Sequence, residues 1–430
     1  MARRWDRWLG LGVAVCVLGA LGSPSAMATI GAVSAVATTT TLTASGSTAA
    51  FDSIVTLTAT VAASGSVPSG SVDFVDQTEA VTFAHVALTA GRAQVTTAAL
   101  LAETHALVAV YKPSGALAGS TSGPTSLKVA PATDTYASTV QQDARHDGNA
   151  AGVAITSKLH RAWTVNLGAN LSYPIIASNR VFETATSSSG ASALYALDRA
   201  SGSIVWGPVS LPANLFTATL AYDGQHIFVL EAERIGNGIL ASYDATTGSL
   251  LWSEVLPLQW WFTGPLTARD GVVYLTGDGF GSNLYAISEF DGTVLWTADI
   301  FGGSSAVSVD ATGVYDVGRC EYAQGFTLAG VQRWWYDAVC GEGAGGSTGV
   351  LHNGKLYARD VGASTLAGVI LDGSAGTVLG HFVSDLAPAF DANNTYYEAG
   401  GTLSAISAAE RRSGRSPIAT SRPPLSQPTA

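Results

Sequence analysis

The sequence predicts an all-β protein: an N-terminal β-sandwich followed by a β-propeller of about six blades, complete or truncated. Glycine is abundant, with 48 residues, and only 12% of the 430 residues are charged, a composition that favours strands and tight turns over helices. Short alternating runs occupy the first part of the chain. In the second part, a motif ending in Trp206, Trp252 and Trp296 recurs at intervals of 46 and 44 residues, which is typical of propeller blades.

The N-terminus predicts a secretory signal peptide over residues 1–28. Three arginines precede an apolar run from Leu9 to Leu21, and residues 25–28 offer the small side chains that a signal peptidase needs. The alternative is an uncleaved anchor helix, but glycines interrupt the run, and a span needs roughly 20 apolar residues. We therefore expect cleavage after Ala28 and a secreted or cell-surface protein.

The charge balance argues against one class of partner. Lysine and arginine number 21 against 32 aspartate and glutamate residues. A chain this acidic has no electrostatic attraction for nucleic acid. We expect the partner to be an extracellular protein or a carbohydrate, and we expect no membrane span after signal cleavage.

The cysteines predict one disulfide. Because Cys16 lies in the predicted signal peptide, Cys320 and Cys340 remain, and two cysteines in an exported chain most simply pair. The bridge would close a 20-residue loop, which chain-entropy arguments value at about 3 kcal/mol. A two-cysteine metal site is the rival interpretation, but it needs further ligands, and His352 is the one nearby candidate.

Alternating runs at regular intervals predict a β-sandwich in the first part of the chain. Along one run, Val55, Leu57, Ala59 and Val61 alternate with polar or small residues, as expected of a sheet covered on one face. The predicted strands are Thr39–Thr43, Val55–Val61, Gly70–Val75, Arg92–Thr96 and His105–Tyr111.

Three of these segments also resemble a known family. The run Thr38–Ser45, the turn and strand Pro68–Phe74, and Val108–Tyr111 are similar to the Ig-like repeat domains of bacterial surface proteins. The resemblance implies an Ig-like β-sandwich over residues 36–130. In that family such domains act as spacers or adhesive modules, and we expect a spacer here.

The repeated motif aligns without gaps over Leu194–Trp206, Leu240–Trp252 and Leu284–Trp296. In each copy a strand leads into a tight turn, where an aspartate can cap the turn and a glycine can adopt a positive φ. The next strand then ends on a tryptophan able to wedge between neighbouring sheets. The structural residues of the repeat are Asp198, Gly202, Trp206, Asp244, Gly248, Trp252, Gly292 and Trp296.

Weaker copies extend the series. Residues 330–334 repeat the end of the motif, residues 372–379 keep the turn but place Gly380 where tryptophan is due, and residues 401–406 begin another copy. Upstream, Trp163 precedes Trp206 by 43 residues. If Leu159–Val165 is the outer strand of the last blade, a sixth blade closes the ring; the alternative is a truncated propeller. Residues 410–430 are predicted to form a disordered tail.

The motif resembles the PQQ-like β-propeller repeat, whose units carry an Ala-Leu-Asp-x-x-Thr-Gly-x-x-x-Trp pattern. The resemblance implies a propeller over residues 135–409, and Gln142–Gly148 is similar to the lead-in that often precedes such propellers. The family includes quinone-dependent dehydrogenases, assembly factors of outer membranes and secreted proteins of unknown role. Membership therefore leaves the function open.

Several short motifs have a structural explanation that we favour over a chemical one. Gly345–Gly349 matches a nucleophile elbow but lies between expected strands, as does the glycine-rich Gly277–Gly281. Asp143, Asp147 and Asn149 could offer oxygens to calcium but lack the spacing of an EF-hand loop. We expect the aromatic clusters Trp260–Phe262 and Trp334–Trp335 to pack between blades rather than to line a ligand site.

We therefore predict a secreted, noncatalytic binding or scaffold protein, in which an Ig-like spacer presents a propeller. The alternative is a quinone-dependent dehydrogenase or another propeller enzyme. The resemblance implies that such dehydrogenases use adjacent cysteines and calcium-binding acidic residues, and this sequence has no adjacent cysteines. Accordingly, no catalytic, cofactor-binding or metal-binding residue is predicted, and no cofactor.

Overall fold

The computed structural model describes residues 35–131, 136–150, 159–212, 217–232, 236–259, 264–277, 283–337, 346–359, 367–391, 393–399 and 401–407.

The first domain folds as two facing sheets, because its strands alternate apolar and polar residues. One sheet has the order β1 (Thr38–Ala44), β3 (Val55–Ala63) and β6 (Arg92–Thr97). The other has the order β2 (Thr48–Ala49), β9 (Thr125–Val129), β7 (Thr104–Pro113), β4 (Gly70–Asp76) and β5 (Val81–Ala87), with β8 (Ser120–Thr121) paired to β7.

All five strands predicted for the sandwich are present, as β1, β3, β4, β6 and β7. In β3 the burial alternates as expected, with Val55, Leu57, Ala59 and Val61 inside. Leu57 packs in one core with Phe74, Leu107 and Leu127 of the opposite sheet. The sandwich is thus held by the apolar faces of its two sheets.

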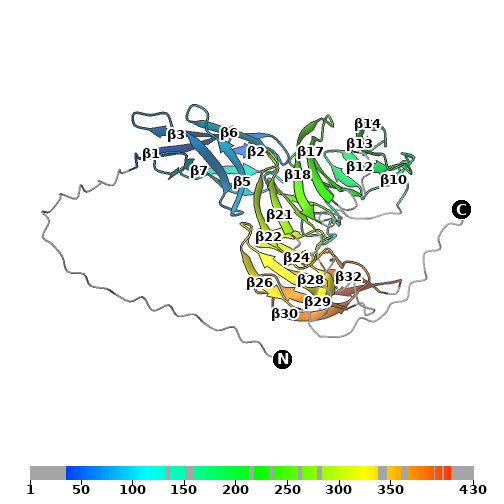
Figure 1. Ribbon diagram of the computed structural model, residues 1–430. Coiled ribbons are helices and arrows are strands. Elements are labelled where there is room, and N and C mark those ends of the chain that lie inside the picture. Colours follow the sequence, from blue (N-terminus) through cyan, green and yellow to red (C-terminus); the bar gives the residue numbers. More distant parts are fainter. Residues whose placement is uncertain are drawn as a thin grey trace, which may run out of the picture. The chain divides into compact units, whose positions relative to one another are not determined.

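Six successive sheets follow, and Figure 1 shows them in chain order from green through yellow to orange. The first three comprise β10 (Asn170–Leu171), β11 (Ile175–Ala177), β12 (Arg180–Thr186), β13 (Ser192–Asp198) and β14 (Ile204–Ser210); β15 (Thr217–Asp223), β16 (His226–Ala232), β17 (Gly236–Asp244) and β18 (Leu250–Gln259); and β19 (Thr267–Arg269), β20 (Val272–Thr276), β21 (Asn283–Ser288) and β22 (Val294–Asp299).

The remaining three sheets comprise β23 (Ser308–Asp310), β24 (Gly313–Val317), β25 (Ala323–Phe326) and β26 (Gln332–Tyr336); β27 (Val350–His352), β28 (Lys355–Arg359), β29 (Ala367–Asp372) and β30 (Val378–Val383); and β31 (Ala389–Phe390), β32 (Asn394–Ala399) and β33 (Thr402–Ser407). Neighbouring strands within each sheet are antiparallel. A 3-10 turn, Arg319–Glu321, links β24 to β25. The all-β fold class, an Ig-like sandwich followed by a propeller, is therefore confirmed.

The repeat tryptophans join each of the first four sheets to the next. The indole Nε1 of Trp206 donates a hydrogen bond to the carbonyl oxygen of Ala245 at 3.0 Å, and the ring covers Gly248, the turn glycine of the following sheet. Four other tryptophans make the same contact, each with a carbonyl oxygen at 2.8–2.9 Å: Trp163, Trp252, Trp296 and Trp334. They cover Gly202, Gly292, Gly330 and Gly376 respectively.

The hairpin turn places each glycine under its tryptophan. In the second sheet Asp244 Oδ1 accepts hydrogen bonds from the backbone N–H groups of Thr246 and Thr247 at 2.9 and 2.7 Å. Gly248 then adopts a φ of +73°, which a residue with a Cβ rarely takes. Asp198 and Gly202 form the same turn in the first sheet, with Ala200 and Ser201 as donors.

The joint between the last two sheets differs, because Gly380 occupies the tryptophan position in β30. An aromatic cluster lies there instead. The ring of Phe382 lies 5.5 Å from that of Tyr397, and the ring of Tyr357 lies 5.0 Å from that of Phe390. Offset aromatic packing can therefore connect these two sheets without an indole.

The closing strand expected at Leu159–Val165 is not formed. Residues 159–169 contain no strand, and the sixth sheet has three strands, with β33 at its edge. Trp163 still takes its expected place, since its Nε1 donates to the carbonyl oxygen of Arg199 and its ring covers Gly202. The side chain of Trp163, rather than strand pairing, fixes this segment to the first sheet.

Some sequence predictions lie outside the described residues. They are the signal peptide over residues 1–28, the disordered tail over residues 410–430, and the aromatic cluster Trp260–Phe262. In the part of the chain that the structure describes, no helix has the length and apolarity needed to cross a bilayer.

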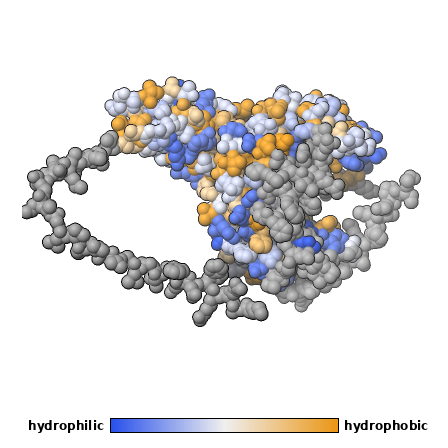
Figure 2. Space-filling model, in the orientation of Figure 1, coloured by the Kyte–Doolittle hydropathy of each residue, from blue (hydrophilic) through white to orange (hydrophobic). Residues whose placement is uncertain are grey.

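Apolar residues on the outer strands are exposed in small groups. Ile204 and Val205, Leu250 and Leu251, and Val378 and Leu379 each form an exposed aliphatic pair at the start of an outer strand. On the face shown in Figure 2, the hydrophobic residues form small patches among hydrophilic ones. Scattered exposure of this kind is ordinary for a soluble surface.

The close packing of Trp206 on Gly248 predicts that a larger residue at position 248 destabilises the protein. A Cβ added there would lie 2.7 Å from the Trp206 ring, in addition to the strain of the positive φ. We expect Gly248→Ala to lower the free energy of unfolding by about 2–4 kcal/mol. Gly354 is a matched control, because its φ is +71° and nothing lies within 4 Å of the added Cβ. Gly354→Ala should cost only about 1 kcal/mol. Guanidinium unfolding measures both variants. If Gly248→Ala and Gly354→Ala lose the same unfolding free energy, close packing of Trp206 on Gly248 is contradicted.

Candidate functional site

A segment that precedes the first sheet contacts all six sheets. We call residues 137–148 the hub segment. Ala137 exchanges two backbone hydrogen bonds with Ile176 in β11, and the carbonyl oxygen of Ser138 accepts from Tyr222 N in β15 at 2.8 Å. Thr139 Oγ1 donates to the carbonyl oxygen of Leu266, just before β19. The first three sheets are thus bound through their innermost strands or the residue before them.

The second half of the hub segment binds the other three sheets. The carbonyl oxygens of Ala144, Arg145 and Asp147 accept hydrogen bonds from Val309 N, Leu351 N and Phe390 N at 2.7, 2.9 and 3.0 Å. These donors lie in β23, β27 and β31, the first strands of their sheets. Since all six sheets bind this segment at an edge strand or at the residue just before it, the chain itself occupies the centre of the propeller.

Two buried side chains reinforce the hub segment. The Nδ1 of His146 lies 2.7 Å from the carbonyl oxygen of Val140, and its Nε2 lies 3.0 Å from Thr267 Oγ1. Burial lowers the pKa of His146, so the neutral form is favoured. The Oδ2 of Asp147 lies 2.9 Å from the Nδ1 of His352.

Asp143 and Asp147, two of the three residues that could offer oxygens to calcium, make hydrogen bonds with neighbouring residues. Asp143 accepts hydrogen bonds from the backbone N–H and the guanidinium of Arg145, and Asp147 Oδ1 accepts from Asn149 N at 3.0 Å. These contacts orient the segment. They give these carboxylates a structural role.

A pocket of about 350 Å³ lies beside the hub segment, between the first and second sheets. Its lining is mainly apolar and carries no charged group, with a few hydroxyl and amide groups from β10, β12, β15 and the residues after β10. The lining residues are Val140, Asn170, Leu171, Ser172, Tyr173, Thr184, Thr186, Ala218, Thr219, Leu220 and Pro265. Tyr173 is 51% exposed, so its ring is available to a ligand. Such a lining suits a neutral ligand rich in hydroxyl groups.

One carboxyl group lies behind this pocket. Glu183 Oε1 accepts a hydrogen bond from Ser172 Oγ at 3.0 Å, and burial raises the pKa of Glu183 to about 7. Glycoside hydrolysis generally requires a second carboxyl group across the scissile bond. Among the described residues that line the pocket, none carries a carboxyl group.

The Ig-like sandwich contacts the propeller through specific polar groups. The described residues of the sandwich and the propeller belong to one compact unit. Asp52, in the turn before β3, accepts hydrogen bonds from Ser178 Oγ and Tyr222 OH, both at 2.6 Å. Farther along, Arg269 forms an ion pair with Glu79, and Ser288 Oγ donates to the carbonyl oxygen of Phe83. The two parts therefore form a junction with directional contacts.

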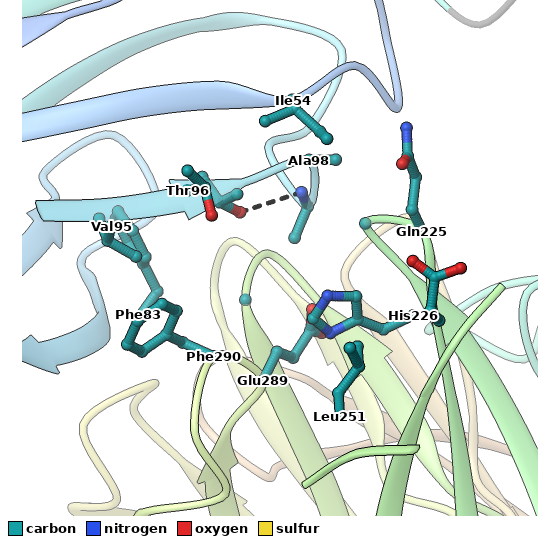
Figure 3. A pocket seen from close by; sticks show the side chains of 15 residues that line it. Ile54, Phe83, Val95, Thr96, Ala98, Gln225, His226, Leu251, Glu289 and Phe290 are labelled. Carbon is teal, nitrogen blue, oxygen red and sulfur yellow. Dashed lines mark hydrogen bonds between the residues drawn. The ribbon is translucent and has the colours of Figure 1, made fainter. Parts of the chain in front are cut away.

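A second pocket, of about 140 Å³, opens within this junction (Figure 3). Ile54, Val95 and Phe83 line it from the sandwich, and Leu251 and Phe290 line it from the propeller. Its titratable lining residues are His226, Asp244 and Glu289. Burial lowers the pKa of His226, and burial together with the charge of Asp223 raises the pKa of Glu289 well above its usual range. Both groups are thereby favoured in their neutral forms.

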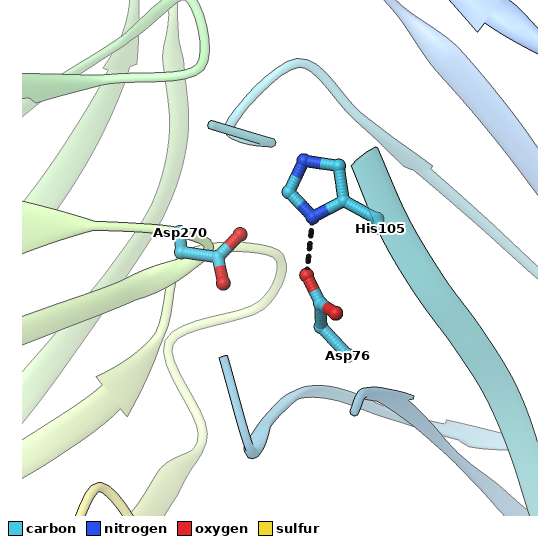
Figure 4. Close-up of side chains that lie close together, drawn as sticks. All are labelled: Asp76, His105 and Asp270. Carbon is cyan, nitrogen blue, oxygen red and sulfur yellow. Dashed lines mark hydrogen bonds and ion pairs between the residues drawn. The ribbon is translucent and has the colours of Figure 1, made fainter. Parts of the chain in front are cut away.

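A third group of titratable residues is fully enclosed by the junction (Figure 4). Asp76 and His105 come from β4 and β7 of the sandwich, and Asp270 comes from the turn between β19 and β20. Their ligand atoms lie within 4.8 Å of one another, and this is the group within the described residues with the geometry to hold a metal ion. Burial lowers the pKa of His105, but Asp76 raises it overall to about 9.

The other motifs singled out in the sequence do not form a chemical site in the part of the chain that the structure describes. Ser347 Oγ donates to the carbonyl oxygen of Arg359, and strand β27 follows it, so the described part of Gly345–Gly349 forms no strand-to-helix elbow. The loop 278–282 lies outside the described residues, but the flanking strands β20 and β21 pair antiparallel. Trp334 is buried as a sheet joint, whereas Trp335 is 50% exposed and stacks on Phe301.

The predicted disulfide stays a prediction, because Cys340 lies outside the described residues. Cys320 lies in the 3-10 turn between β24 and β25. Gly318, which precedes Cys320, forms an antiparallel bridge with Gly346, which follows Cys340. The chain is therefore held together on either side of the two cysteines.

Two family models match the chain. Residues 42–130 match the bacterial Ig-like domain of group 3, and residues 190–325 match a PQQ-like repeat model described as the outer membrane protein assembly factor BamB. The chain thus carries a bacterial Ig-like domain followed by a PQQ-like repeat region. Both resemblances seen in the sequence are confirmed. No curated protein matches the chain.

Solved structures with a similar fold are distant in sequence. BamB from Moraxella catarrhalis is 18% identical over 57% of this chain and 70% of its own, with a TM-score of 0.41. Quinohemoprotein alcohol dehydrogenases from Pseudomonas putida HK5 and Comamonas testosteroni are each 13% identical, with TM-scores of 0.45. They match over 59% and 65% of this chain, which spans 48% and 53% of their lengths. These likenesses carry no information about activity.

Asp316 in β24 is a buried carboxyl group outside the junction and the pockets. Burial raises its pKa from 3.8 to about 7, and contacts with Ser305 and the backbone of Val317 offset this effect only in part. The folded state therefore holds a proton that the unfolded state releases. Its contribution to stability is present below about pH 4 and is lost as the pH rises towards 7.

We expect Asp316→Asn to match the wild type at pH 4 and to exceed it in unfolding free energy at pH 8, by on the order of 4 kcal/mol. Denaturant unfolding across pH 3–8 measures this. Asp391→Asn is a control of opposite sign, because hydrogen bonds from Tyr396 and from backbone N–H groups lower the pKa of Asp391 to about 2. A stability difference for Asp316→Asn that is independent of pH would contradict the assignment.

Proposed function

We propose that this chain is a secreted, noncatalytic scaffold that binds a carbohydrate on its propeller, with the Ig-like domain as a fixed spacer. The observation that supports this most is the hub segment, which fills the centre of the propeller with the chain's own backbone. A site for a large cofactor at that centre would have to displace hydrogen bonds to several sheets. Secretion rests on the N-terminal sequence pattern.

The uncharged pocket beside the hub segment supports a carbohydrate partner over a charged one. The hydroxyl oxygens of Ser172 and Thr219 donate within the protein and can accept hydrogen bonds from sugar hydroxyls, and the exposed ring of Tyr173 offers an apolar face to a pyranose ring. Because none of the described lining residues carries a carboxyl group, the pocket fits binding better than hydrolysis.

A panel of neutral polysaccharides and oligosaccharides tests this proposal on the purified full chain. We expect Tyr173→Ala to weaken binding of the retained glycan about tenfold or more, which corresponds to a stacking contribution of about 1.4 kcal/mol. Trp335→Ala is the matched control, because Trp335 is equally exposed but lies in the fourth sheet. Absence of glycan binding, or equal weakening by both variants, would contradict the pocket assignment.

The alternative, a quinone-dependent dehydrogenase, predicts a different result. Purified chain supplied with the quinone and Ca²⁺ should reduce an electron-accepting dye when alcohols or sugars are added. We expect no turnover above the rate measured without protein. Sustained dye reduction that depends on both quinone and substrate would overturn the noncatalytic proposal.

A further inference from the structure

Three buried side chains meet at the junction in an arrangement with the geometry to hold a cation. Asp76 and His105 are 0% and 1% exposed, and Asp270 is 3% exposed. The Nδ1 of His105 lies 2.5 Å from Asp76 Oδ2, and Figure 4 shows the Asp270 carboxylate facing the same pair. Two carboxylates and an imidazole therefore converge on one point, from two different domains.

The hydrogen bonds around His105 fix the role of each ring nitrogen. Its Nε2 lies 2.8 Å from the carbonyl oxygen of Leu101, which can only accept, so Nε2 carries a proton. The position between Nδ1 and Asp76 Oδ2 is then filled either by a second proton, which the raised pKa of His105 favours in the metal-free protein, or by a metal ion that replaces this proton. Two lone pairs at this distance repel each other unless a proton or a metal ion lies between them. A backbone carbonyl that orients the remote nitrogen is the usual partner of a metal-binding histidine.

Asp270 provides evidence for a bound cation that does not depend on His105. Both of its oxygens are buried, and neither has a hydrogen-bond partner. Arg269, the neighbouring cation, forms its ion pair with Glu79 instead. A buried carboxylate without a partner is costly, because desolvation is not offset by any hydrogen bond. A bound cation would satisfy both oxygens at once.

We propose that Asp76, His105 and Asp270 bind one divalent transition-metal ion that ties the Ig-like domain to the propeller. A mixed set of one imidazole nitrogen and carboxylate oxygens suits Zn²⁺ or Mn²⁺ better than Ca²⁺, which prefers oxygen alone. Ligand atoms of one such ion lie roughly 3 Å apart, so the His105 and Asp76 side chains need to separate only slightly. Asp76 Oδ1 accepts a hydrogen bond from Thr78 N at 2.9 Å, which holds the carboxylate in place.

This site is independent of the carbohydrate pocket. Its ligands come from β4, β7 and the β19–β20 turn, whereas the pocket lies between the first and second sheets. Since two ligands belong to the sandwich and one to the propeller, the ion would make the orientation of the spacer depend on metal. Loss of the ion would leave the remaining contacts of the junction in place.

Isothermal titration of Zn²⁺ into the full chain, stripped with EDTA and free of any histidine tag, tests the proposal. We expect one stoichiometric binding step per chain, and a higher unfolding temperature in Zn²⁺ than in EDTA. Asp270→Asn keeps the shape and the His105–Asp76 pair but removes one ligand, so it should weaken the affinity at least tenfold and abolish the thermal shift.

Asp316→Asn is the matched control, because it removes another fully buried carboxylate that is not one of the three proposed ligands. It should bind Zn²⁺ like the wild type. Circular dichroism of each variant reports whether it is folded, and His105→Gln provides a second ligand variant with the same expected loss. Absence of a stoichiometric step in the wild type, or equal affinity in wild type and a folded Asp270→Asn, would overturn the proposal.

Discussion

The propeller depends on the backbone hydrogen bonds of the hub segment. Blades of a propeller expose the edge of their innermost strand towards the axis, and unpaired edges there would leave buried polar groups without partners. Residues 137–148 supply those partners in order around the axis. To do so the segment bends sharply, with positive φ values at Gln141, Gln142, His146 and Gly148. Non-glycine residues adopt such angles at a cost of about 1–2 kcal/mol each, which the surrounding contacts must offset.

The tryptophan joints complement the hub at the outer strands. Each indole covers a turn glycine of the next sheet and donates to a carbonyl oxygen, so neighbouring sheets are fixed both at their inner edges and at their outer strands. The Ig-like sandwich rests on this frame through Asp52, Glu79 and Phe83. A rigid frame with a rigid spacer suits a protein that presents a binding surface.

The sequence predicts those parts of the structure that depend on side-chain type. The repeat tryptophans and turn glycines indicated how sheets meet, and alternation indicated five strands of the sandwich. Strand β5 was missed because its burial does not alternate, as a register shift between Phe74 and Val75 interrupts its pairing with β4. The hub contacts could not be predicted, because they use backbone atoms that every residue has.

The residues of the candidate sites could not be predicted from local sequence patterns either. Asp76 and His105 lie 29 residues apart, and Asp270 lies far beyond them in another domain, so no ligand spacing reveals the cluster. The pocket beside the hub segment similarly combines hydroxyl residues from β12, from β15 and from the two residues that follow β10. Resemblance to a repeat family predicted the frame but no binding residue, since the repeat positions are occupied by packing residues.

Hydrogen exchange measured by mass spectrometry on the full chain tests the central claim most directly. The amides of Ile176, Tyr222, Val309, Leu351 and Phe390 donate to the hub segment. We expect peptides containing them to exchange as slowly as the central strands of their sheets. Exchange of these inner-edge amides at the rate of exposed loops would show that the hub segment does not hold the propeller together.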